Sequence, residues 1–302
     1  MARATIATLE GASKRYGALT ALEPTDLAIG AGEVLALLGP NGAGKTTALG
    51  LLTGRLSPDA GRARLFGQDP RDWQARRQIG VMLQEAKLPE TLRVAELIRL
   101  QSGYYAAPRL LAETLELAGL VDIAQRRYSQ LSGGQQRRVQ FALAICGRAP
   151  LLFVDEPTVG LDVDARRNFW RVLRQLRASG SSIVLTTHYL EEADALADRI
   201  VLLAGGRVLA EDTPAGIKAR ASGKRVRAGT RLPAALIASW PEAQAVQMDG
   251  ERCEIRTAHP EALLRRLLAA DASLSELEVL PLSLEEAFLS LTNPATALPE
   301  AA

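Results

Sequence analysis

The chain has 302 residues, which suffices for one large domain or for a large domain and a small one. Hydrophobic residues make up 47% and charged residues 23%, which excludes gross disorder, and the net charge of +2 argues against a dedicated nucleic-acid binder. The spacing of Cys146 and Cys253 matches neither a zinc site nor a redox pair, so we interpret both as reduced thiols of a cytosolic protein.

Membrane-spanning and secretion signals are not found in the sequence. No apolar run approaches the roughly 18 residues needed to cross a bilayer, and the N-terminus lacks the apolar core of a signal peptide. We therefore expect a chain that does not span a membrane but that can dock on one through a partner.

Short apolar runs alternate with helical patterns along the first two thirds of the chain. The runs "EVLALLGP", "PLLFVDEP" and "SSIVLTTH" each precede such a pattern, which indicates a parallel sheet covered on both faces. Residues 199–212 predict a hairpin with its turn at Gly205 and Gly206. Between about residues 85 and 148 helical periodicity replaces the strand signals, which indicates a helical insert.

The character of the sequence changes past Pro214, and we place a domain boundary near residue 219. Two predicted strands meet at Asp249 and Gly250, and a helix, a strand and the final helix "SLEEAFLSLT" follow. In that last helix Ser283 and Glu286 form a capping-box pattern. Residues 1–218 and 219–302 are thus expected to form a large domain and a small α+β domain.

The sequence "GPNGAGKTT" fits the phosphate-loop pattern G-x-x-x-x-G-K-[ST] between an apolar strand and a helical pattern. The residues expected at a nucleotide are Gly39, Pro40, Asn41, Gly42, Ala43, Gly44, Lys45, Thr46 and Thr47. Lys45 is expected to reach the β- and γ-phosphates, and Thr46 to ligate Mg²⁺. The alternative, a plain glycine turn with a solvated lysine, is disfavoured by the strand–helix context.

Polar side chains end three of the predicted strands. Asp155 and Glu156 follow "LLFV"; beside a phosphate loop, Asp155 is expected to hold Mg²⁺ and Glu156 to polarise the attacking water as general base. His188 ends "SSIVLTTH", where a donor could stabilise charge on the γ-phosphate, although a structural histidine is the alternative. Gln84 ends the strand before the insert and would otherwise be a solvated amide.

A second glycine-rich loop, "LSGGQ", opens a helical pattern at residues 131–135 but contains no lysine. Such a loop at a helix N-terminus offers N–H donors and a positive dipole to a phosphate without one. The alternative is a helix N-cap after a flexible turn. The arginines that follow, Arg137 and Arg138, are interpreted as solvated or salt-bridged rather than catalytic.

In combination these motifs resemble the ATP-binding cassette (ABC) ATPases over roughly residues 7–214. Tyr16 matches the aromatic residue that stacks on adenine, Gly39–Thr47 the Walker A loop, and Gln84 the Q-loop. The family signature is matched by Leu131–Ser132–Gly133–Gly134–Gln135. Asp155 with Glu156 matches Walker B, Asp162 the D-loop, and His188 the switch histidine. The resemblance implies an α/β P-loop NTPase with a RecA-like parallel sheet core, an antiparallel β subdomain and the helical insert. It implies ATP and Mg²⁺ as cofactors. The residues implied at the metal are Thr46, Gln84 and Asp155, and those implied in catalysis are Lys45, Gln84, Glu156 and His188.

The resemblance also implies partners and a location. Two such domains pack head to tail, so Ser132 and Gly134 would contact the γ-phosphate held by the partner's Lys45. We expect an ATP-dependent homodimer, with a paralogue as the alternative partner, and no nucleic acid. A membrane permease would engage through coupling helices near the Gln84 insert, which places the chain on the cytoplasmic face of the cell (inner) membrane.

Two segments favour export. "SLEEAFLSLT" is similar to the C-terminal helix of bacterial ABC subunits that serve drug, lipid and polysaccharide exporters with separate permeases, and "PTVGLDVDARRNFW" resembles the same branch. The alternatives are an importer ATPase and a non-transport ABC ATPase acting as a soluble regulator. For residues 219–302 the resemblance implies a regulatory or dimer-stabilising role.

Overall fold

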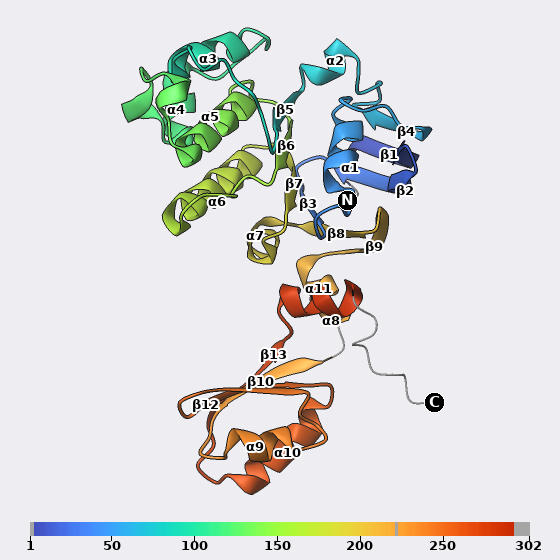
Figure 1. The fold of residues 1–302 in the computed structure, drawn as a ribbon, viewed down its shortest axis with the longest axis vertical. Coiled ribbons are helices and arrows are strands. Elements are labelled where there is room, and N and C mark those ends of the chain that lie inside the picture. Colours follow the sequence, from blue (N-terminus) through green and yellow to red (C-terminus); the bar gives the residue numbers. More distant parts are fainter. Residues whose placement is uncertain (1–2, 221–222, 293–302) are drawn as a thin grey trace. The chain divides into compact units, whose positions relative to one another are not determined.

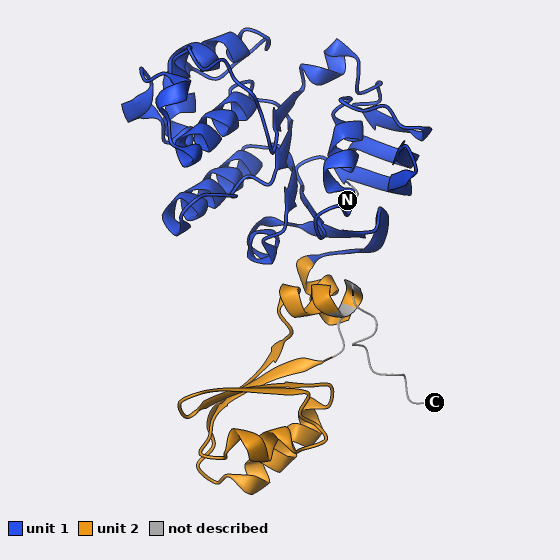
Figure 2. Ribbon diagram, in the orientation of Figure 1, with its two compact units in different colours: residues 1–213 blue, residues 214–302 orange. Residues whose placement is uncertain are grey.

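The computed structural model describes residues 3–220 and 223–292, which form two compact units, residues 1–213 and 214–302 (Figures 1 and 2). The division lies a few residues before the boundary expected near residue 219. Helix α8 (Pro214–Arg220) belongs to the second unit because it packs against α11 (Leu284–Thr292).

A six-stranded sheet forms the centre of the first unit. Its strands lie in the order β5 (Ile79–Met82), β6 (Leu151–Asp155), β7 (Ser182–Thr187), β3 (Val34–Leu38), β8 (Arg199–Ala204) and β9 (Arg207–Asp212). All neighbouring pairs are parallel except β8 and β9, which form an antiparallel hairpin. The predicted parallel sheet and the hairpin turn at Gly205 and Gly206 are confirmed.

Strands β3, β6 and β7 are buried along their whole lengths. Because successive side chains of a strand point to opposite faces, each of these strands contributes to two cores. In β6, Leu152 and Val154 belong to one hydrophobic cluster and Leu151 and Phe153 to the other. The two-sided burial explains why these strands are apolar without alternation.

Helices pack on one face of this sheet, and a second sheet with further helices packs on the other (Figure 1). The first cluster contains α3 (Val94–Ser102), α4 (Leu111–Ala118), α5 (Gly133–Ile145), α6 (Val163–Ala178) and α7 (Leu190–Leu196), with 3₁₀ turns at Val121–Ile123 and Tyr128–Gln130. The second contains α1 (Lys45–Leu52), α2 (Trp73–Arg76) and an antiparallel sheet of β2 (Leu19–Gly30), β1 (Thr5–Tyr16) and β4 (Ala60–Leu65). The expected parallel core, antiparallel subdomain and helices after Glu85 are all present.

The second unit is built on an antiparallel sheet whose strands lie in the order β11 (Ala245–Asp249), β12 (Arg252–Thr257), β10 (Lys224–Gly229) and β13 (Ser275–Pro281). Helices α9 (Ala234–Ala238) and α10 (Pro260–Ala270) supply part of its hydrophobic core. The predicted capping box is confirmed, since Ser283 N donates to Glu286 Oε2 at 2.7 Å and Ser283 Oγ accepts from Glu286 N at 3.2 Å.

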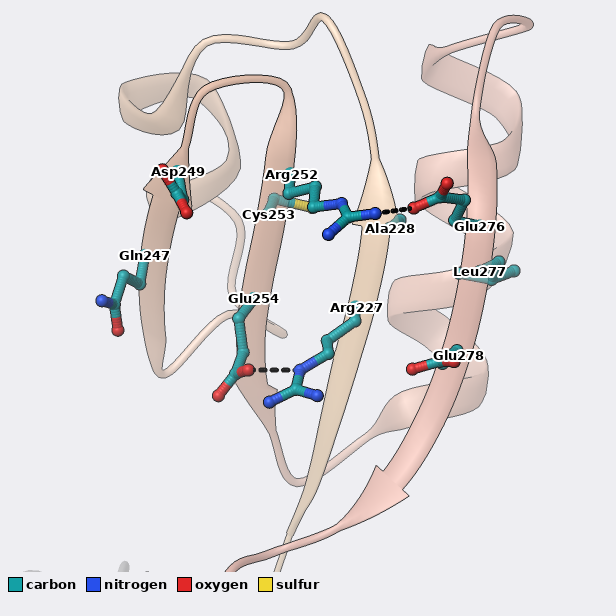
Figure 3. Close-up of a pocket in the computed structure, with 10 residues that line it drawn as sticks. All are labelled: Arg227, Ala228, Gln247, Asp249, Arg252, Cys253, Glu254, Glu276, Leu277 and Glu278. Atoms are coloured by element: carbon teal, nitrogen blue, oxygen red, sulfur yellow. Dashed lines mark hydrogen bonds and ion pairs between the residues drawn. The ribbon is translucent and has the colours of Figure 1, made fainter. Parts of the chain in front are cut away.

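The open face of this second sheet is polar (Figure 3). Ion pairs cross the strands between Arg227 and Glu254 and between Arg252 and Glu276, and they line a hollow of about 710 Å³. Side chains of the alternate positions, such as Cys253 and Ile255, are buried in the core on the opposite face. The alternation of polar and apolar residues in β12 therefore reflects a sheet covered on one face.

Candidate active site

The loop Gly39–Thr47 follows β3 at the carboxyl end of a central strand and includes the first three residues of α1. At Gly44 φ is +101°, and a Cβ would lie 2.6 Å from the carbonyl oxygen of Ala21, so a side chain is excluded there. At Gly42 φ is +80°, and no atom lies within 4 Å of a Cβ built on it. The loop is thus packed against the protein on one side and open on the other, as a phosphate cradle requires.

The side chain of Lys45 is buried within this loop, with 6% of the residue exposed. Its Nζ donates to the carbonyl oxygens of Gly39 at 2.7 Å and Pro40 at 3.1 Å. Burial lowers the pKa of Lys45, and the charges of Glu156 and Asp155 oppose that shift. The ammonium group is therefore held by neutral carbonyls, which the more strongly attracting oxygens of a phosphate can replace.

Asp155 ends β6 and is buried. Its carboxylate accepts a hydrogen bond from Thr186, and Thr46 Oγ1 lies 3.4 Å from its Oδ2. Desolvation raises the pKa of Asp155, and the hydrogen bond from Thr186 opposes this. A hydroxyl and a carboxylate are the oxygen ligands that Mg²⁺ prefers, so the pair formed by Thr46 and Asp155 fits that cation.

Glu156 is the centre of a second group of polar side chains. Gln84 Nε2 donates to its Oε2 at 3.2 Å, and its Oε1 lies 3.5 Å from Nδ1 of His188. The φ of Glu156 is +45°, in the left-handed region that residues other than glycine seldom adopt. The strand thus turns sharply at the residue expected to act as base.

Six of the predicted residues are brought to one edge of the parallel sheet. Lys45 and Thr46 follow β3, and Gln84 follows β5. Asp155 is the last residue of β6, Glu156 comes directly after it, and His188 follows β7. Open α/β sheets bind their ligands outside the carboxyl ends of the strands, and this group occupies that edge.

The rest of the loop Gly39–Thr47 lies at the same edge, whereas Tyr16, Asp162 and residues 131–135 belong to other elements. Tyr16 ends β1 and is 48% exposed, and Asp162 caps α6 by accepting from Ala165 N at 2.7 Å. In the signature loop, Ser132 and Gln135 form a capping box on α5, with Ser132 N donating to Gln135 Oε1 at 3.0 Å. Within residues 3–220, no hydrogen bond or ion pair joins residues 131–135 to residues 39–47.

Two residues in contact with the site were not predicted. Thr186 donates to Asp155, and its place two residues before His188 was the available signal. The interpretation of Arg137 as solvated or salt-bridged was wrong. It is buried, and its guanidinium donates to main-chain carbonyls at the ends of β5 and β6, whereas Arg138 donates to the carbonyl of Gly119.

Comparison with known proteins shows the family. The model for the family described as "ABC transporter" matches residues 22–159. The chain is 38% identical to the daunorubicin resistance ATP-binding protein DrrA3 of Streptomyces coeruleorubidus over 99% of each chain. It is also 38% identical to the Nod factor export ATP-binding protein I of Rhizobium sp. (strain N33), covering 94% of this chain and 96% of that one.

Solved structures agree with this result. An ATP-binding subunit of an ABC transporter superposes with a TM-score of 0.67 at 30% identity, covering 72% of this chain and 93% of that one. The dimeric bacterial ABC transporter cassette MJ0796 superposes with a TM-score of 0.63 at 27% identity, covering 69% of this chain and 98% of that one. The protein is a P-loop ATPase with an ABC cassette. It belongs to the ABC transporter family, as an ATP-binding subunit.

Proposed function

We propose that this chain is the ATPase subunit of an exporter whose membrane permease is a separate chain. The observation that carries this proposal is the extent of the similarity, because the daunorubicin resistance and Nod factor export proteins match both units of the chain and not the cassette alone. No helix among residues 3–220 and 223–292 is long and apolar enough to cross a membrane.

The nucleotide in this proposal lies along the loop Gly39–Thr47, with its adenine on the exposed ring of Tyr16. Lys45 would exchange its contacts with loop carbonyls for oxygens of the β- and γ-phosphates, supported by the N–H groups of the first turn of α1. Thr46, Asp155 and Gln84 would hold Mg²⁺, which neutralises phosphate charge when bound. The open space at Gly42 supports this assignment because the loop can be approached there.

Hydrolysis in this proposal is the in-line attack of water on the γ-phosphorus. Glu156 takes a proton from the water, the bond from the γ-phosphorus to the bridging oxygen breaks, and ADP and phosphate are the products. Gln84 and His188 orient the carboxylate of Glu156, since both lie within 3.5 Å of its oxygens. His188, whose side chain is 42% exposed, can also donate to the γ-phosphate.

The signature loop completes the site of a second copy. Residues Leu131–Gln135 lie at the N-terminus of α5, which is 13 residues long, and their N–H groups and helix dipole favour an anion. Because no hydrogen bond or ion pair joins this loop to the phosphate loop within residues 3–220, we assign its phosphate to the partner subunit, in a head-to-tail homodimer with the D-loop Asp162 near the interface. The cassette MJ0796, which forms a dimer, supports this arrangement.

Coupling to the membrane is assigned to the helical insert of about residues 85–148, beside Gln84, within an ABC domain of about residues 1–218. The chain would then be peripheral on the cytoplasmic face of the cell membrane. We expect a tagged chain to co-purify from membranes with an integral permease whose presence raises its ATPase rate. Binding instead to an importer permease with a periplasmic binding protein, or to no membrane protein, would contradict the proposal.

The C-terminal unit is proposed to regulate or stabilise the dimer. It has its own hydrophobic core around Val226, Ile255 and Leu263, so its removal leaves the two cores of the first unit intact. Deleting residues 214–302 is expected to weaken the ATP-bound dimer at least about tenfold and to change the ATPase rate. Sedimentation with ATP measures the dimer, and an unchanged dimer with an unchanged rate would remove this role.

A further inference from the structure

Arg137 lies in the second turn of α5 and is 9% exposed. Its guanidinium donates to main-chain carbonyl oxygens of two other segments, which end β5 and β6. The hydrogen bonds run from Nη1 to Leu83 O and Gln84 O at 2.8 Å each, from Nη2 to Asp155 O at 2.5 Å and Glu156 O at 2.6 Å, and from Nε to Pro157 O at 3.3 Å. Nη1 also donates to Gln140 Oε1 at 2.8 Å.

Carbonyls rather than carboxylates surround this buried charge. Its acceptors at the strand ends are main-chain carbonyls. Burial lowers the pKa of Arg137, and the charges of Asp155 and Glu156 only oppose that shift. A buried charge is costly unless its donors are all satisfied. Arginine has five N–H donors in a rigid planar fork, whereas lysine has three donors at one point. Only the fork can hold the ends of both strands at once.

The contact with Glu156 coincides with the strained backbone at that residue. In an extended strand consecutive carbonyls point in opposite directions, yet the carbonyls of Asp155 and Glu156 both accept from the same nitrogen, Nη2 of Arg137. They converge because the chain turns into the left-handed region at Glu156, with φ at +45°. A conformation of this kind persists only where its surroundings hold it in place.

We propose that Arg137 is a positioning residue for ATP hydrolysis. It holds the end of β5 against the end of β6, at the spacing where the Gln84 amide meets the Glu156 carboxylate at 3.2 Å. In this role it acts through main-chain carbonyls rather than through the reacting atoms. The inference rests on the proposed role of Glu156 as general base.

The first test compares Arg137→Lys with Arg138→Lys in the full-length chain, with its permease where turnover requires it. A shift of about 1 Å in a catalytic group costs about 100-fold in rate, so kcat of Arg137→Lys is expected to fall by about that factor. The affinity for ATP is expected to change less than about threefold, because Arg137 does not contact the loop Gly39–Thr47. Arg138→Lys should retain kcat within about twofold, since the guanidinium of Arg138 donates to Gly119 O and not to the ends of β5 and β6.

A second variant keeps the proposal testable if lysine is poorly tolerated. Arg137→Ala leaves room for a free guanidinium ion, which is expected to restore at least about tenfold in kcat at millimolar concentration, whereas ammonium is not. Wild-type kcat in Arg137→Lys overturns the proposal. A loss of ATP affinity in Arg137→Lys equal to its loss of kcat also overturns the proposal. So does failure of guanidinium to restore turnover in Arg137→Ala.

Glu156→Gln, measured in parallel, separates this inference from the proposed function. If Glu156→Gln turns over normally, the base assignment fails and the positioning role fails with it. If Glu156→Gln is inactive while Arg137→Lys is fully active, only the role of Arg137 is overturned. Loss in both variants, with ATP binding kept, supports both.

Discussion

Replacing Glu156 by glutamine is expected to reduce ATP hydrolysis by at least about 100-fold, because the amide cannot take the proton of the attacking water. The side chains differ little in size, so the contacts with Gln84 and His188 change little in geometry. ATP binding should therefore persist, and the ATP-bound dimer, which hydrolysis would reopen, should accumulate. Steady-state phosphate release and sedimentation with ATP measure the two effects.

The control for this substitution is Glu191→Gln, which removes an exposed carboxylate near His188 without touching the site. It should leave both turnover and dimerisation unchanged. Wild-type turnover in Glu156→Gln would remove Glu156 as the base. A protein that stays monomeric with ATP, with its permease present, would instead contradict the head-to-tail dimer.

Mixing two inactive variants is expected to restore activity. Lys45→Ala removes the phosphate-binding ammonium, and Gly134→Asp places a negative charge where the partner's γ-phosphate is proposed to lie. A mixed dimer then has one site with both defects and one site with neither. Random pairing makes half of all dimers mixed, so the mixture should recover about a quarter of wild-type activity if the sites act independently.

Each variant assayed alone provides the control and should be inactive, since every site of a homodimer then carries one defect. The Gly134→Asp subunit is expected to fold, because a Cβ at residue 134 would lie 3.6 Å from its nearest neighbour, Leu161 Cδ2. If the signature served the ATP of its own chain, each subunit would carry a defective site and mixing would restore nothing. The measurement therefore decides between a shared site and a self-contained one.

Much of the site followed from local sequence. The phosphate loop, the two carboxylates and His188 each sit where a run of apolar residues stops, and parallel strands deliver such ends to one edge of the sheet. The glycine-rich patterns have a local cause as well, since Gly42 and Gly44 adopt φ values of +80° and +101°. The contact of Gln84 with Glu156 joins two strand ends that are far apart in the chain, and no local pattern encodes it.

The alternation of strands and helices, the phosphate loop and the capping box at Ser283 were determined by the sequence alone, because periodicity and backbone hydrogen bonding act over a few residues. Tertiary structure decided the role of Arg137. Helix α5 buries residues on most of its circumference from Val139 onward, so helical periodicity cannot separate Arg137 from Arg138. Arg137 differs from Arg138 because its guanidinium meets the main-chain carbonyls at the ends of β5 and β6. These carbonyls lie side by side only after the sheet has formed.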